Sequence, residues 1–172
     1  MNRSKIFGII AFDPNGTIGV EGRLPWHYPQ ELTHFSKTIR GHIIVMGYCT
    51  FIFFPKKYFE HSFGIVFSRR KHVKTEKNVI FIHSLDAFLS LDCFVEGKDI
   101  YVIGGAQICT LFLKANLIEK LILTELKHIH KGDVFFPLTL IRDWPRQKVE
   151  ECEDFTTYHY YNPSLLLNYY PT

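Results

Sequence analysis

A series of short, continuously apolar runs separated by polar turns is the feature of this sequence that most constrains its fold. Each run is too short to cross a membrane and is typical of a strand buried on both faces of a sheet. Asp13 and Pro14 form a turn signal that ends the first run. The runs cover residues 6–12, 42–46, 63–68, 79–82, 100–103 and 120–126.

Helical patterns follow several of these runs. Pro29 suits the first position of a helix, and apolar residues recur at helical spacing as far as Ile39, so we expect a helix over residues 29–39. Strand followed by helix indicates an α/β protein, and the alternating tail 148–161 predicts two antiparallel strands at the sheet edge. The other expected helical pieces run from a Thr50 cap to Pro55, from a Ser84 cap over residues 85–91, and over residues 106–115.

Length and composition narrow the class of protein. A chain of 172 residues fits one domain with a sizeable core, and a net charge of +3 is too small to imply nucleic acid. The tight basic cluster at 69–71 is better suited to a phosphate group than to a duplex. Four cysteines without a C-x-x-C pair favour neither a zinc site nor a disulfide framework, so we expect reduced cysteines in a cytoplasmic protein without a membrane span.

The loop and helix start at residues 17–35 carry the first candidate site. Ile18 and Gly19 belong to a segment that predicts a mobile surface loop, not a strand. Glu31 lies in the first helical turn, four residues before Phe35, which puts its carboxylate on the apolar helix face. One interpretation is a surface acid that complements the helix dipole. The other is a partly buried acid beside Trp26, with a raised pKa, that supplies a proton to a substrate.

The pair Gly104–Gly105 is the second candidate site. It stands between a predicted strand and a predicted helix, where exposed backbone N–H groups and the helix N-terminus favour an anion. Two adjacent glycines are also common in simple tight turns, and the chain contains neither G-x-G-x-x-G nor a P-loop. Thr124 is a hydroxyl in an apolar strand and needs a hydrogen-bond partner. His128 and His130 are expected on a solvated edge, because two imidazoles without a third ligand do not indicate a metal site.

Taken in order, these pieces resemble the dihydrofolate reductase family, from residue 6 to about residue 161. Many short motifs in the family's order carry the resemblance. They are Ile18-Gly19, Leu24-Pro25-Trp26, Pro29-x-Glu31-Leu32-x-x-Phe35, Val45-Met46-Gly47 with Thr50, Ser68-Arg69, Val102-Ile103-Gly104-Gly105, Thr124 and Gly132-Asp133-x-x-Phe136-Pro137.

The resemblance implies an α/β fold with a central, mostly parallel sheet, an antiparallel C-terminal edge and flanking helices. It also implies reduction of dihydrofolate with NADPH, by hydride transfer to pterin C6. Glu31 would bind the pterin amino group and N3 and promote protonation of N5, which favours the buried-acid interpretation. Thr124 would hydrogen-bond the acid and the pterin, and Trp26 would form a wall of the pocket and hold an ordered water.

The same resemblance implies the remaining site residues. A single domain over residues 1–172 would include an adenosine-binding part at about 42–97, the loop 15–24 would close over the nicotinamide, and the protein would be a monomer open to antifolate-type inhibitors. The implied substrate-binding residues are Ile9, Ala11, Leu32, Phe35, Phe54, Lys56 and Ile103. The implied cofactor-binding residues are Ala11, Ile18, Gly19, Gly47, Cys49, Thr50, Ser68, Arg69, Gly104, Gly105, Ala106, Gln107 and Ile108, with Ser68 and Arg69 at the adenosine 2′-phosphate.

Two departures from the family pattern affect these expectations. Tyr48 stands where the family usually has a basic residue facing the cofactor phosphates. Ser62 stands in the segment where the family usually has an arginine for the glutamate tail of the substrate. A reductase of the same fold that acts on a tail-less pterin or pyrimidine therefore remains an alternative. A folate- or nucleotide-binding protein without turnover is a further alternative, which Glu31, Trp26 and Thr124 argue against.

Overall fold

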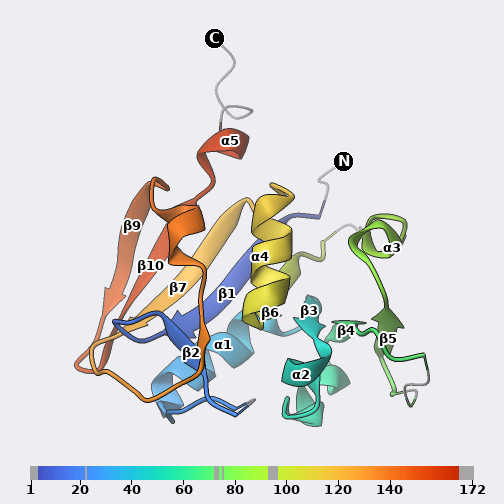
Figure 1. Ribbon diagram of the computed structural model, residues 1–172, viewed down its shortest axis with the longest axis horizontal. Helices are drawn as coiled ribbons and strands as arrows, with labels where there is room; N and C mark the ends of the chain where they lie inside the picture. The colour runs from blue at the N-terminus through green and yellow to red at the C-terminus, as the bar shows by residue number, and fades with distance from the viewer. Residues whose placement is uncertain (1–3, 22, 72–73, 75, 93–96, 167–172) are drawn as a thin grey trace.

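One eight-stranded sheet runs through the protein in the computed structural model, which describes residues 4–21, 23–71, 74, 76–92 and 97–166. The strand order is β5-β4-β3-β6-β1-β7-β10-β9 (Figure 1). All neighbouring strands from β5 to β7 are parallel, and the pairs of β10 with β7 and with β9 are antiparallel. The strands are β1 Ile6–Phe12, β3 Ile43–Gly47, β4 Phe63–Phe67, β5 Val79–Ile82, β6 Ile100–Gly104, β7 Lys120–Leu126, β9 Arg146–Glu151 and β10 Phe155–Tyr161.

Helices cover both faces of this sheet. Because side chains alternate along a strand, Ile9 and Ile10 of β1 enter different apolar clusters. The cluster of Ile10 includes Phe112 of α4, and the cluster of Ile9 includes Ile39 of α1, so these two helices pack on opposite faces (Figure 1). The helices are α1 Pro29–Ile39, α2 Tyr48–Phe51, α3 Leu85–Leu89, α4 Ala106–Lys114 and α5 Pro163–Leu166, with 3-10 helices η1 Lys56–Glu60 and η2 Leu138–Ile141.

The α/β fold with an antiparallel edge is confirmed, and so are most element boundaries. The helix α1 covers the expected residues, and the Ser84 hydroxyl accepts a hydrogen bond from the N–H of Ala87 as the cap of α3. The prediction that Thr50 caps a helix was wrong. It lies inside α2, whose N-cap is Gly47, because the chain turns into helix directly at the end of β3.

The expectation of a loop at residues 17–19 was also wrong. Thr17–Gly19 forms strand β2, which pairs with β8, Val134–Phe135, in a second, two-stranded sheet. Gly132 packs so closely on Thr17 and Gly19 that a Cβ there would meet both residues. The partner of β2 is far along the chain, so local composition indicated a loop. No helix among the described residues has the length and apolar character needed to cross a membrane.

Candidate active site

Helix α1 places the Glu31 carboxyl in the apolar interior. Pro29 opens the helix and Tyr28 is its N-cap, so Glu31 lies in the first turn. The residue is only 7% exposed, and this burial raises the pKa of the Glu31 carboxyl to about 7. The surface-acid interpretation is therefore wrong for this residue. A carboxyl with this pKa is protonated in a substantial fraction of molecules at neutral pH, as a proton donor requires.

Aromatic rings gather on the face of α1 that carries Glu31. Phe35, one turn after Glu31, packs edge-on against Phe54 and Tyr58, with ring centroids 6.3 Å and 5.8 Å away. Burial raises the pKa of Tyr58, and so does the negative charge of Glu31, which places this phenol within electrostatic reach of the acid. We call Glu31, Phe35, Phe54 and Tyr58 the acid pocket. Tyr58 was not predicted, because it lies in η1, which has no clear periodic pattern.

The predicted substrate-binding residues gather on the α1 face of the sheet. Ile9 is buried in the cluster on that face, and Ala11 lies two residues further along β1, on the same side. Lys56 differs from this group. Its ammonium donates a hydrogen bond to the Phe51 carbonyl at 2.7 Å and lies 3.2 Å from the centre of the Phe51 ring. Three partly buried residues pack against the same cluster, Phe35, Phe54 and Ile103. Leu32 is partly buried in α1.

Thr124 lies at the centre of the sheet, beside Ala11 on one side and Thr157 on the other. It is 4% exposed. The backbone register sets Thr124 on a strand next to β1, which carries Ile9 and Ala11. Its proposed contact with the acid and the pterin stays a prediction.

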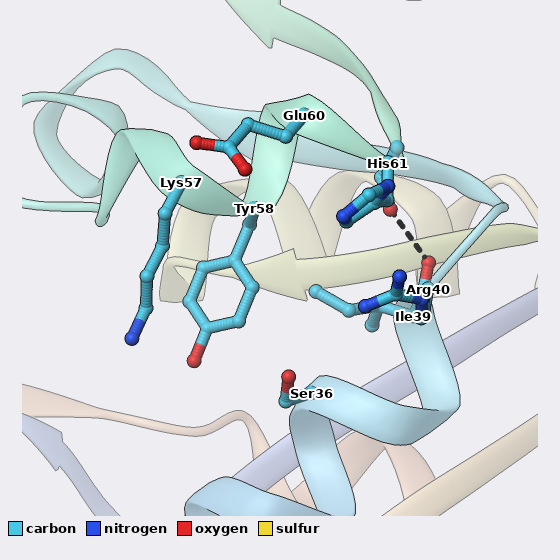
Figure 2. Close-up of a pocket in the computed structure, with 8 residues that line it drawn as sticks. Ser36, Ile39, Arg40, Lys57, Tyr58, Glu60 and His61 are labelled. Atoms are coloured by element: carbon cyan, nitrogen blue, oxygen red, sulfur yellow. Dashed lines mark hydrogen bonds between the residues drawn. The ribbon is translucent and has the colours of Figure 1, made fainter.

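A cavity of about 260 Å³ opens between α1 and η1, next to Tyr58 of the acid pocket. Ser62 is 7% exposed, and its hydroxyl donates a hydrogen bond to the Ile39 carbonyl at 2.9 Å. Ser62 thus ties β4 to the end of α1. Figure 2 shows labelled side chains on the α1 side of this α1–η1 cavity and others, from η1 and the residue after it, on the opposite side. They are Ser36, Ile39 and Arg40, and Lys57, Tyr58, Glu60 and His61.

The cations of this cavity come from separate elements. Arg40 follows the last residue of α1, Lys57 lies in η1, and Glu60 contributes an opposing carboxylate. Arg40 had not been identified as a site residue from the sequence. Its position after a helix gave no sign that the fold would bring it to the same cavity as Lys57 and His61.

The glycine pair lies where the carboxyl ends of two parallel strands meet. Met46 of β3 is in register with Gly104 of β6, and the Thr50 hydroxyl lies 3.5 Å from the position a Gly105 Cβ would take. Gly104 has a φ of +131°, which L side chains rarely adopt, and its peptide bond to Gly105 is cis. We call Gly47, Thr50, Gly104 and Gly105 the glycine turn. At this end of the sheet Gly47 and Gly105 are half-buried and Gly104 is buried, and no side chain covers their backbone from the glycines themselves.

Helix α4 begins directly at the glycine turn. Gly105 is its N-cap and supplies no side-chain hydrogen bond, so the first backbone N–H groups of α4 remain available to an anion. Among the other predicted cofactor residues here, Gln107 is exposed, Ala106 and Ile108 are half-buried, and Cys49 is exposed in α2. Ile18 packs against the α4 side of the core, and Gly19 lies beside it in β2.

Ser68 and two arginines follow β4. The buried Ser68 hydroxyl accepts a hydrogen bond from the Arg70 N–H at 3.1 Å, and Arg69 is exposed. The Arg70 guanidinium lies 4.7 Å from the centre of the Tyr48 ring, next to Gly47 of the glycine turn. Positive charge is therefore present close to the position where Tyr48 replaces the family's usual basic residue.

His130 is not on a solvated edge, so that prediction was wrong. It is half-buried, and its ring contacts Trp26 and Tyr28. His128 is exposed, and its Nε2 lies 3.7 Å from Asp154 Oδ1. Sequence spacing had grouped the two histidines on one strand face, but β7 ends at Leu126, before both of them.

Cys93 and Gly22 lie outside the described residues.

A buried acid, an apolar wall and a turn of glycines at the carboxyl ends of parallel strands define an enzyme of the α/β class. A family model for dihydrofolate reductase matches residues 5–164. The chain is 30% identical over 165 residues to dihydrofolate reductase of Staphylococcus haemolyticus, covering 91% of this chain and 92% of that protein. It is 33% identical over 135 residues to the Lactococcus lactis enzyme, covering 78% and 79%.

A solved structure of dihydrofolate reductase from Enterococcus faecalis, complexed with NADP(H) and RAB-propyl, has the same fold. The TM-score is 0.70 at 24% identity, over 94% of this chain and all of that one. The chain belongs to the dihydrofolate reductase family.

Proposed function

We propose that the protein reduces 7,8-dihydrofolate to 5,6,7,8-tetrahydrofolate with NADPH. The observation that carries the proposal is Glu31, an acid that is 7% exposed and whose pKa is raised to about 7 by burial. It lies among aromatic rings that suit a flat, heteroaromatic substrate. The names of the relatives and the ligands of the Enterococcus faecalis enzyme agree with this choice.

Glu31 has two tasks in this mechanism. Its carboxyl holds the pterin amino group and N3, and it promotes protonation of N5. The cofactor, when bound, supplies the hydride that pterin C6 receives. Thr124 completes the hydrogen bonds around the acid, and Trp26 forms a wall of the pterin pocket.

The residues at the other end of the site fit a dinucleotide with phosphate groups. The glycine turn and the uncapped start of α4 offer N–H donors for the pyrophosphate. Ser68 and Arg69 follow β4, where an exposed guanidinium suits the adenosine 2′-phosphate. Residues 42–97, which include β3, β4 and β5, form the adenosine-binding part of a single domain. The segment 15–24, which contains β2, closes over the nicotinamide, and the protein works as a cytoplasmic monomer.

The test is the loss of the near-ultraviolet absorbance of NADPH when dihydrofolate and the purified protein are mixed. We expect a loss that requires all three components and that falls strongly in Glu31→Gln. Glu153→Gln removes an exposed carboxylate outside the acid pocket and is a matched control. Oxidation of NADPH without dihydrofolate, or equal rates in both variants, would contradict the proposed function.

A second candidate is a same-fold reductase of a pterin or pyrimidine that lacks a glutamate tail. The observation that favours it is Ser62, whose hydroxyl is engaged by the Ile39 carbonyl and offers no charge to a carboxylate. The α1–η1 cavity supports the first candidate, because Arg40 and Lys57 bring positive charge to a space that Tyr58 and His61 also line. Comparing KM for dihydrofolate and tail-less dihydropteroate separates the two candidates.

A further inference from the structure

The His130 side chain connects the segment after β7 to the start of the acid helix. Its ring meets the Trp26 ring edge-on, with centroids 5.2 Å apart, and the Tyr28 ring at 6.1 Å. Its Nε2 lies 3.4 Å from the Tyr28 hydroxyl. Tyr28 is the N-cap of α1, and its carbonyl accepts the N–H of Leu32. The His130 side chain therefore contacts Tyr28, the residue that precedes the first helical turn with Glu31.

The backbone of His130 is fixed independently of its ring. Its N–H donates to Asp13 Oδ2 at 2.8 Å, while Asp13 Oδ1 accepts the N–H groups of Asn15 and Thr17. Burial acts to raise the pKa of Asp13, but these hydrogen bonds outweigh it and hold the pKa below its usual range. A substitution at position 130 keeps this backbone bond, so it tests the side chain alone.

Two buried polar atoms of this cluster have no hydrogen-bond partner among the described residues. They are Nδ1 of His130 and Nε1 of Trp26, which belong to rings in contact. An unpaired buried donor or acceptor is costly, and pairs of such atoms are commonly bridged by water. Trp26 Nε1 can only donate, whereas His130 Nδ1 donates or accepts according to its tautomer, so one water can serve both.

We propose that His130 is a positioning residue for the reduction: with Trp26 it binds a buried water and fixes the orientation of the Trp26 ring at the pterin pocket. The consequence for turnover rests on the proposed function, because that function makes Trp26 a wall of the pterin pocket. Nothing in this role involves NADPH directly. Loss of the His130 nitrogen should therefore lower kcat and leave NADPH affinity unchanged.

Three substitutions separate the ring nitrogens from the ring surface. His130→Phe keeps the aromatic area and removes both nitrogens, His130→Asn places an amide near the position of Nδ1, and His130→Gln places one near Nε2. We expect His130→Phe and His130→Gln to lose roughly tenfold in kcat, the scale of one hydrogen bond. His130→Asn should remain within about twofold of wild type, and all three should bind NADPH with the wild-type Kd by calorimetry.

A fluorescence readout follows the Trp26 environment without turnover. The chain has two tryptophans, so Trp144→Phe leaves Trp26 as the sole tryptophan, which can be excited selectively over the tyrosines. In that background His130→Phe should shift the emission maximum and His130→Asn should not. Urea unfolding identifies any variant that has lost its fold. If His130→Phe has lost its fold, the comparison of His130→Gln with His130→Asn tests the proposal instead.

Two results would overturn the proposal: full kcat in His130→Phe, or a His130→Asn variant as slow as His130→Phe. A double-mutant cycle adds a third check. If the two rings share one water, adding His130→Phe to Trp26→Phe should lower kcat little further. Fully additive effects of the two substitutions on kcat would contradict a shared water. If wild type reduces no dihydrofolate at all, the proposed function fails, while the fluorescence shifts still decide whether His130 Nδ1 orients Trp26.

Discussion

The acid pocket and the glycine turn handle charge in opposite ways. In the acid pocket a single carboxyl is buried among Phe35, Phe54 and Tyr58, and burial alone raises its pKa. Around the glycine turn the charges of Arg69 and Arg70 are exposed, and the helix start offers backbone donors in place of a buried side chain. Solvent screens the exposed charges around the glycine turn, but it does not screen the buried carboxyl of the acid pocket. One residue should therefore dominate the chemistry, while several should share the binding of phosphate.

The largest effect should follow from Glu31→Gln. We expect turnover at neutral pH to fall by roughly a hundredfold or more, the scale of a positioned acid, with the native structure retained and NADPH binding nearly unchanged. Lowering the pH should restore part of the rate, because substrate protonated by solvent no longer needs the acid. The measurement is kcat across neutral to acid pH, beside wild type and Glu153→Gln. A deficit that stays constant with pH would refute this role.

The same substitution should change the pH dependence of stability. A buried carboxyl with a folded pKa of about 7 and an unfolded value of 4.5 binds its proton more tightly in the folded state, so stability falls as pH rises between these values. Glu31→Gln should match wild type near pH 4.5 and exceed it by about 3 kcal/mol above pH 7. Urea unfolding at several pH values checks this. A pH-independent difference would show that burial does not penalise the charge.

Arg69→Ala should weaken NADPH by about tenfold and NADH much less, because only NADPH carries the 2′-phosphate. Calorimetric Kd values for both cofactors give the result. Arg70→Ala is the neighbouring control and should cost less, because its guanidinium already lies across Tyr48. Equal losses for NADPH and NADH in Arg69→Ala would place Arg69 at a group common to both cofactors.

The smallest effect should come from the α1–η1 cavity. Arg40→Ala should raise KM for dihydrofolate by roughly threefold to tenfold and leave dihydropteroate unchanged, because an exposed cation holds a carboxylate only weakly. His61→Arg adds a guanidinium at an exposed position of the same cavity and should lower KM for dihydrofolate alone. Ser62→Arg is not a suitable gain variant, because Ser62 is buried and bonded to Ile39. If Arg40→Ala affects both substrates equally, Arg40 does not contact the tail.

Sequence patterns within one segment were sufficient to predict elements that form from that segment alone. Pro29 and the spacing of Leu32, Phe35 and Ile39 predicted α1 as it is observed, and the burial of Glu31 follows from the face it shares with Phe35. They were insufficient where the partner is distant. The pairing of β2 with β8, and the contact of His130 with Trp26, depend on tertiary geometry that local composition does not encode.

The place of β1 in the sheet has a consequence for synthesis on the ribosome. β1 is the first strand made, yet its neighbours are β6, Ile100–Gly104, and β7, Lys120–Leu126. At about 5 to 20 residues per second, this apolar strand emerges several seconds or more before either neighbour exists. Slow, long-range pairing of this kind leaves apolar surface open to other chains. The nascent chain should therefore depend on chaperones most while residues 12–126 are being made.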